Sequence, residues 1–107
     1  MKRQFYNLVF ILLSASVFSQ NFSVFAKVVD EDDSSAIGAA VSLLNISDSS
    51  MVKAASVNLR GILKMQDIPA GNYILKIEFI EYKDEFRKIE VNTDLRLGKI
   101  KLKPDTK

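Results

Sequence analysis

The chain has 107 residues, with 15 Lys and Arg against 13 Asp and Glu, and it contains neither Cys nor His. The missing Cys excludes disulfides and thiolate metal sites, and the missing His excludes Ser-His and Cys-His nucleophile pairs and imidazole ligands. Two of the basic residues, Lys2 and Arg3, fall in a leader-like segment; without them 13 basic residues face 13 acidic ones, and a neutral domain has no electrostatic reason to bind nucleic acid.

Residues 1–19 have the pattern of a secretory signal peptide. Lys2 and Arg3 give a positive start, Leu8–Leu13 is the centre of an apolar run, and small or modest side chains precede a cut before Gln20. The apolar run is shorter than the roughly 18–20 residues of a spanning helix, although an uncleaved anchor or a buried helix remains the alternative. Cleavage would leave 107 − 19 = 88 residues, enough for one two-layer core.

The remainder of the chain alternates apolar and polar residues in short runs, and no stretch after the leader has helical periodicity. Seven short runs separated by turn residues predict a β-sandwich. The expected strands are Phe22–Asp30, Gly38–Asn45, Met51–Val57, Ile62–Gln66, Asn72–Ile80, Glu85–Val91 and a last strand that begins near Leu95 and ends before Pro104.

The fifth of these strands has the clearest alternation. Tyr73, Leu75, Ile77 and Phe79 share one phase, which predicts that they point into the core. Before this strand, Pro69 and Gly71 suit the second and fourth positions of a type I turn, and we interpret the turn as a hairpin between the fourth and fifth strands.

Two further glycines predict local backbone features. Asn58 and Gly61 look like a hairpin connection between the third and fourth strands, because Asn opens turns and Gly adopts a positive φ. In the last strand the apolar phase changes around Gly98, which predicts a β-bulge or the true start of the strand there.

The acidic run from Asp30 to Asp33, with Asp48 nearby in space, is a candidate Ca²⁺ site because it clusters carboxylate oxygens. The spacing of an EF-hand loop is missing, so a solvated acidic turn is the competing interpretation. Ser34, Ser35 and the Ser49–Ser50 pair lack a positioned base and are interpreted as turn residues.

Two other groups of side chains are candidates for function. Four carboxylates could supply an acid/base pair for glycoside hydrolysis, or could only balance nearby Lys and Arg across strands: Glu78, Glu81, Asp84 and Glu85. Five apolar side chains could form one exposed docking face for another domain, or be partly buried: Phe25, Ile74, Ile80, Tyr82 and Phe86.

The order of motifs resembles the carboxypeptidase regulatory-like domain. The resemblance covers about Phe22–Lys103 and rests on the segments Lys27–Asp32, Gly38–Leu43, Asn58–Gly61, Ile68–Tyr73, Ile80–Tyr82 and Leu97–Leu102. Two positions depart from the family pattern, since Leu63 stands where Phe is common and Glu81 stands where Gly usually precedes the Tyr.

The resemblance implies an all-β, seven-stranded prealbumin-like (transthyretin-like) Greek-key sandwich at residues 20–103, after the leader and before a polar tail or linker at 104–107. It implies a non-catalytic domain with no cofactor, no metal and no active-site residues, of the kind found at the start of TonB-dependent-receptor and other outer-membrane β-barrel proteins of Bacteroidetes. The expected location is the periplasm, at the inner face of the outer membrane, and the expected partner is a β-barrel or its plug domain, on the same or another chain.

Three hypotheses of function follow from the sequence. The first is an accessory or docking module of an outer-membrane receptor, of which this chain could be an N-terminal fragment. The second is a free-standing exported module that binds carbohydrate or protein through an aromatic face including Tyr82 and Phe86. The third, an enzyme or its detached accessory domain, is disfavoured because the usual nucleophile–base pairs cannot be assembled without His and Cys.

Overall fold

The computed structural model describes residues 20–105, so the expected signal peptide at 1–19 lies outside the described residues. This part of the chain folds into seven strands and contains no helix, hence no helical membrane span. The strands are β1 (Asn21–Val29), β2 (Ala40–Asn45), β3 (Met51–Ser56), β4 (Ile62–Pro69), β5 (Gly71–Glu78), β6 (Glu85–Val91) and β7 (Leu95–Lys101).

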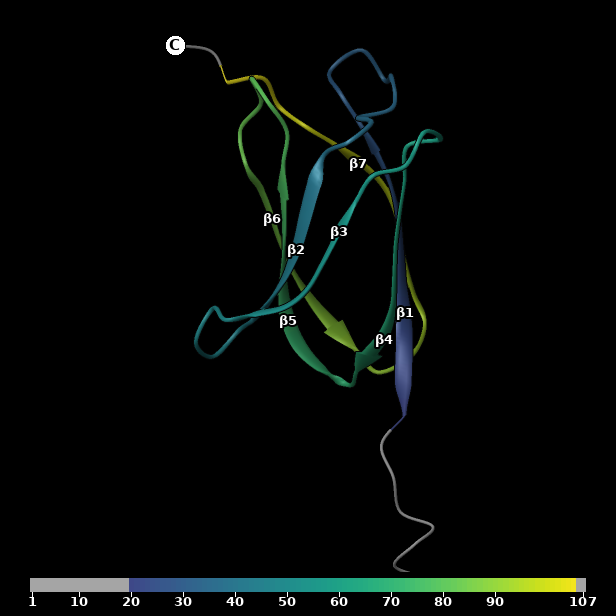
Figure 1. Ribbon diagram of the computed structural model, residues 1–107, viewed down its shortest axis with the longest axis vertical. Helices are drawn as coiled ribbons and strands as arrows, with labels where there is room; N and C mark the ends of the chain where they lie inside the picture. Colours follow the sequence, from purple (N-terminus) through teal and green to yellow (C-terminus); the bar gives the residue numbers. More distant parts are fainter. Residues whose placement is uncertain (1–19, 106–107) are drawn as a thin grey trace, which may run out of the picture.

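The strands form two sheets that pack face to face (Figure 1). One sheet has the order β4-β1-β7 and the other has the order β3-β2-β5-β6. All neighbouring strands are antiparallel except β1 and β7, which run parallel. The all-β sandwich expected from the sequence is therefore confirmed.

The core lies between the two sheets. It consists of the side chains that the sequence alternation places on the inward face of each strand. Val24 and Val28 of β1, Leu43 of β2, and Leu75 and Ile77 of β5 are each fully buried. Such a side chain contributes about 1.5–3 kcal/mol when it leaves water. Among the fifth-strand residues expected in the core, Tyr73 is buried and Phe79 is only partly buried at the edge of the cluster.

The two connections that flank β4 are not hairpins, which corrects the expectation from the sequence. Strand β4 pairs with β1, whereas β3 and β5 both pair with β2 in the other sheet, so each connection crosses between sheets. The turn chemistry itself is as expected in the first connection. The Asn58 side-chain oxygen accepts hydrogen bonds from the amides of Arg60 and Ile62, and Gly61 has a φ of 80°.

The second connection is very short. Strand β4 ends at Pro69 and β5 begins at Gly71, which leaves only Ala70 between them. The Tyr73 hydroxyl donates a hydrogen bond of 2.6 Å to the Pro69 carbonyl, so the core side chain of β5 also fixes the turn before it.

Two β-bulges explain the irregular apolar phases. The register of β7 against β1 shifts between Arg96 and Lys99, next to Gly98 with its φ of 76°, which confirms the expected bulge. The register of β3 against β2 also shifts, so that Val52 is an extra residue and is partly exposed, while Val57 beyond the bulge is buried.

The connection after β1 and the segment after β7 flank a residue of β1 that the alternation predicts to be outward-facing. Val29 is buried, because Ser35 bridges to it from one side and the Leu102 amide donates to its carbonyl from the other. Past β7, Pro104 pairs with Tyr82, and the connection between β5 and β6 is thereby tied to the last described residues.

Candidate docking surface

The acidic turn after β1 is organised by its own backbone and by lysines. The Asp30 carboxylate accepts hydrogen bonds from the amides of Asp32 and Ser34, at 2.8 and 3.0 Å. The Asp33 carboxylate lies 3.5 Å from the ammonium groups of both Lys99 and Lys101 on β7. These two cations, Lys101 foremost, lower the pKa of Asp33 below its ordinary value.

Asp48 does not join this turn, contrary to the expectation of a shared Ca²⁺ site. It lies in the turn between β2 and β3, at the opposite end of β2 from the acidic turn (Figure 1). There it accepts hydrogen bonds from the amide and hydroxyl of Ser50, and the amide bond lowers the pKa of Asp48. Within residues 20–105 no group of three or more carboxylates is placed to hold a metal ion.

The candidate serines and carboxylates occupy ordinary surface positions. Ser34 and Ser35 lie in the turn after β1, and Ser49 and Ser50 lie in the turn after β2. Glu81 and Asp84 lie in the connection between β5 and β6, whereas the other two candidate carboxylates pair along their own strands and not across them. Glu78 lies 3.7 Å from Lys76, and Glu85 lies 3.0 Å from Arg87.

The five apolar side chains expected to share one docking face are distributed over three places. Phe25 lies on the outer face of the three-stranded sheet, and Ile74 and Phe86 lie on the outer face of the four-stranded sheet. Ile80 and Tyr82 lie in the connection between β5 and β6, where the Tyr82 ring packs 5.4 Å from that of Phe79. A single aromatic face built from these residues is therefore wrong.

A shallow groove that the sequence did not predict crosses the outer face of the three-stranded sheet. It has a volume of about 300 Å³ and is lined by Phe25, Ala26, Lys27, Ile62, Arg96 and Gly98. The bulge in β7 produces this hollow, because Gly98 adds no side chain between Arg96 and Lys99, and nothing lies within 4 Å of the position a Cβ would take there. Its floor is apolar and its rim is cationic.

Phe25 is held at the centre of this face by two cations. In the register of the sheet it lies directly beside Lys64 of β4 and Arg96 of β7. The Lys64 ammonium is 6.0 Å and the Arg96 guanidinium 5.0 Å from the centre of the Phe25 ring, the geometry of cation–π contacts. Lys64, Phe25 and Arg96 therefore lie side by side in one row across the three strands.

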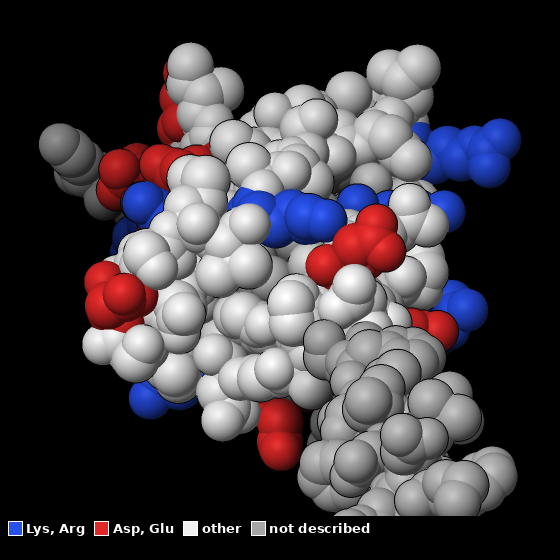
Figure 2. All heavy atoms as spheres, turned by 60° about the horizontal axis from the view of Figure 1, so that its bottom comes forward, with Lys and Arg blue, Asp and Glu red and all other residues white. Residues whose placement is uncertain are grey.

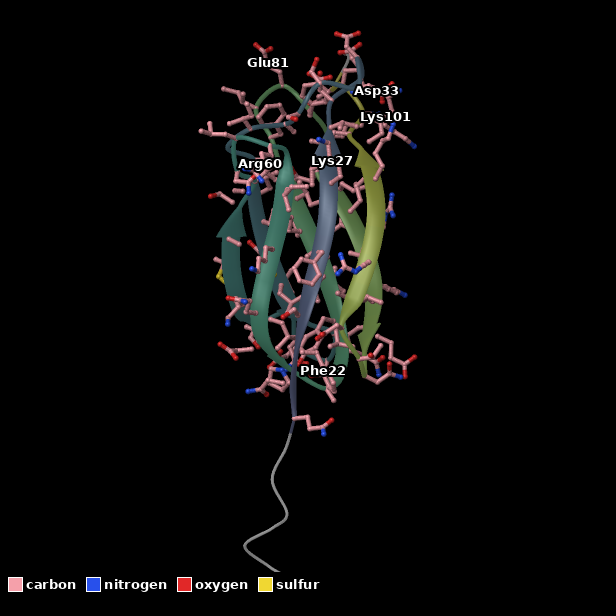
Figure 3. All side chains as sticks on the ribbon, turned by 90° about the vertical axis from the view of Figure 1, so that its right-hand side faces the viewer. Phe22, Lys27, Asp33, Arg60, Glu81 and Lys101 are labelled. Carbon is pink, nitrogen blue, oxygen red and sulfur yellow. The ribbon has the colours of Figure 1, made fainter. Side chains whose placement is uncertain are left out.

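The charged outward residues of these three strands are mostly cationic. The basic face, as we name it, comprises Lys27, Lys64, Arg96, Lys99 and Lys101, and the one acidic residue within β4, β1 or β7 is the exposed Asp67, near the end of β4 where the register against β1 is irregular. Figure 3 views this face, with Lys27 beside Arg60 and Asp33 close to Lys101. By contrast, Figure 2, which turns the lower end of Figure 1 forward, shows acidic and basic side chains scattered singly.

Only part of the basic face is neutralised within residues 20–105. Asp33 pairs with Lys99 and Lys101, whereas Lys27, Lys64 and Arg96 have no ion-pair partner there. Lys27 instead donates a 2.8 Å hydrogen bond to the Arg60 carbonyl. Two of the three unpaired cations, Lys27 and Arg96, line the groove, and Lys64 lies beside Phe25.

No protein-family model matches the chain, and no curated protein matches it by sequence. Solved structures do match its fold. The TIE protein of Bacillus anthracis superposes with a TM-score of 0.62 at 20% identity, over 78% of this chain and 16% of that one. BcpA, the major pilin subunit of Bacillus cereus, matches with a TM-score of 0.64 at 15% identity, over 80% of this chain and 30% of that one.

The 5-hydroxyisourate hydrolase of Klebsiella pneumoniae also matches, with a TM-score of 0.57 and 17% identity, over 79% of this chain and 92% of that one. The fold is therefore a prealbumin-like sandwich that occurs both in pilin subunits and in a hydrolase. The chain spans 16% of the length of the TIE protein and 30% of the length of BcpA, so in those proteins the matched fold is one part of a longer chain.

Proposed function

We propose that the chain is a non-catalytic β-sandwich module that docks to an outer-membrane β-barrel protein or its plug domain from the periplasmic side. The observation that carries the proposal is the basic face with its groove, where three cations have no acidic partner within residues 20–105. Unpaired cations gathered on one face are typical of a surface that binds a partner of opposite charge.

The leader-like pattern at residues 1–19 and the resemblance to receptor-associated domains support the proposed location. The candidate hydrolytic residues support a non-catalytic role, because the structure engages Glu78 and Glu85 in ion pairs and Ser50 in a turn.

Cross-linking in cells that produce the chain tests this function. A photoreactive amino acid at position 96, on the basic face, is expected to cross-link the module to a membrane-embedded β-barrel protein, with the product in the outer-membrane fraction. The matched control carries the same group at position 88, on the outer face of the four-stranded sheet, and is expected to give little product. Recovery of the chain in the cytosol, or equal cross-linking from both positions, would overturn the proposal.

A further inference from the structure

We infer that the groove of the basic face binds an acidic, extended segment of a partner polypeptide, with carboxylates at Lys64 and Arg96 and an apolar side chain against Phe25 and Ile62. This inference rests on the proposed docking function and names the chemistry of the partner. The groove itself is present in the described fold and needs no rearrangement to be reached.

Charge complementarity is the first argument. Lys27 and Arg96 line the groove and Lys64 lies beside Phe25. None of the three pairs with a carboxylate within residues 20–105, while Asp33 engages the two lysines farther along β7. The chain as a whole carries nearly balanced charge, so the excess of cations around the groove is a local feature and not a reflection of composition. An acidic partner would supply the missing charges and speed its own encounter with this face.

Spacing is the second argument. Lys64 and Arg96 flank Phe25 in one row across three strands, which separates their backbones by roughly 10 Å, two inter-strand distances. Lys27 follows Phe25 by two residues along β1, a step of about 6.7 Å, which equals the spacing of alternate side chains in an extended peptide. Glutamates at alternate positions of a partner segment can therefore reach more than one of these cations.

The Phe25 ring distinguishes between kinds of partner. Lys64 and Arg96 approach it from the strands on either side, with their cationic groups 6.0 and 5.0 Å from the ring centre. A sugar ring stacked on Phe25 would have to compete with these cations for the aromatic ring. The same contacts hold the two cations in place and reduce the entropy lost when each one binds a carboxylate. A polypeptide is for this reason favoured over an acidic polysaccharide.

Peptide binding to the full chain tests the inference. The probe is a fluorescein-labelled peptide of alternating Glu and Val, compared with a peptide of alternating Gln and Val and with polygalacturonate. The variant Lys64→Gln/Arg96→Gln is expected to weaken binding of the Glu peptide about tenfold, as for two exposed charge pairs, and added salt is expected to weaken it further. Amide shifts in an NMR titration are expected in β1, β4 and β7.

The matched control is Lys76→Gln/Lys88→Gln on the outer face of the four-stranded sheet, where Lys76 also lies over an aromatic ring, that of Phe86. This variant removes the same charge and should retain binding. Equal loss in both variants, or equal affinity for the Glu and Gln peptides, would overturn the inference. Binding of polygalacturonate alone would overturn the polypeptide partner but leave docking intact, whereas peptide binding without cellular cross-linking would overturn only the receptor association.

Discussion

Single residues in this sandwich often serve two parts of the fold at once. Tyr73 fills the core with its ring and fixes the crossing between sheets with its hydroxyl. Asp33 ends an acidic turn in a left-handed conformation and neutralises two lysines of β7. The sequence predicted the first role of each residue from alternation and turn composition, but the second role depends on contacts between distant segments.

The two roles of Tyr73 can be separated by substitution. Tyr73→Phe keeps the ring and removes the bond to the Pro69 carbonyl, so it is expected to lower the free energy of unfolding by about 1 kcal/mol. Tyr73→Ala also empties the buried site and is expected to cost about 3–5 kcal/mol. Urea unfolding followed by circular dichroism measures both values, and an alanine variant as stable as the parent chain would contradict the assigned strand phase.

Asp33 should make the stability of the fold depend on pH in the acidic range. The lysines on β7 lower its pKa in the folded chain, so the stabilisation is present above the ordinary value of 3.8 and is lost as the pH falls through the lower folded value. Asp33→Asn is therefore expected to lower the urea midpoint at neutral pH and to leave it almost unchanged in strong acid. Because Asp33 is exposed, the effect is small and should shrink with salt. An equal loss at both pH values would instead indicate a packing role.

At the level of elements, the alternation of apolar and polar residues predicted the seven strands and most of their inward faces. A strand with one buried face places every second side chain in the core. It did not predict which strands pair. Turn residues such as Asn58, Gly61 and Pro69 indicate that the chain reverses, but the same chemistry serves a hairpin and a crossing between sheets. The basic face was missed for this reason, since Lys27, Lys64 and Arg96 become neighbours only once β1 lies between β4 and β7.

Gly98 in the β7 bulge and Gly61 in the connection before β4 both have a positive φ, but they should differ in their tolerance of a side chain. Gly98→Ala adds a Cβ in open space, so only the strained backbone counts, about 1–2 kcal/mol of lost stability. At Gly61 the same Cβ would lie 2.6 Å from the Ser35 hydroxyl oxygen, and we expect about 1–3 kcal/mol of further loss from overpacking. Thermal or urea unfolding of the two variants provides the comparison, and equal losses would contradict the close packing at the β3–β4 crossing.

For the whole molecule, the parallel pairing of β1 and β7 determines where the described ends lie. β1 leads away from Asn21, and β7 runs beside it in the same direction toward Pro104, so the two ends of the described region lie at opposite poles (Figure 1). The groove lies between these poles on the side of the sheet. A partner at the basic face would therefore contact the module laterally.

Because the chain has no Cys, introduced thiols can measure this arrangement without background. Spin labels on Gln20→Cys and Asp105→Cys are expected to be separated by about 30 Å, since β1 alone spans nine residues at about 3.3 Å each. Labels on Gln20→Cys and Ala70→Cys form the control and should be close, because Asn21 pairs with Pro69. A short distance between the first two labels would contradict the parallel pairing.

The parallel ladder also determines how the sandwich would respond to tension. A force that pulls the two described ends apart acts along β1 and β7 in opposite directions, so it shears their hydrogen bonds, which lie on both sides of the Gly98 bulge. Bonds loaded in shear share the force and yield together, whereas the strands of a hairpin peel apart one bond at a time. We therefore expect the β1–β7 ladder to resist a force between the described ends better than a hairpin loaded at its open end would.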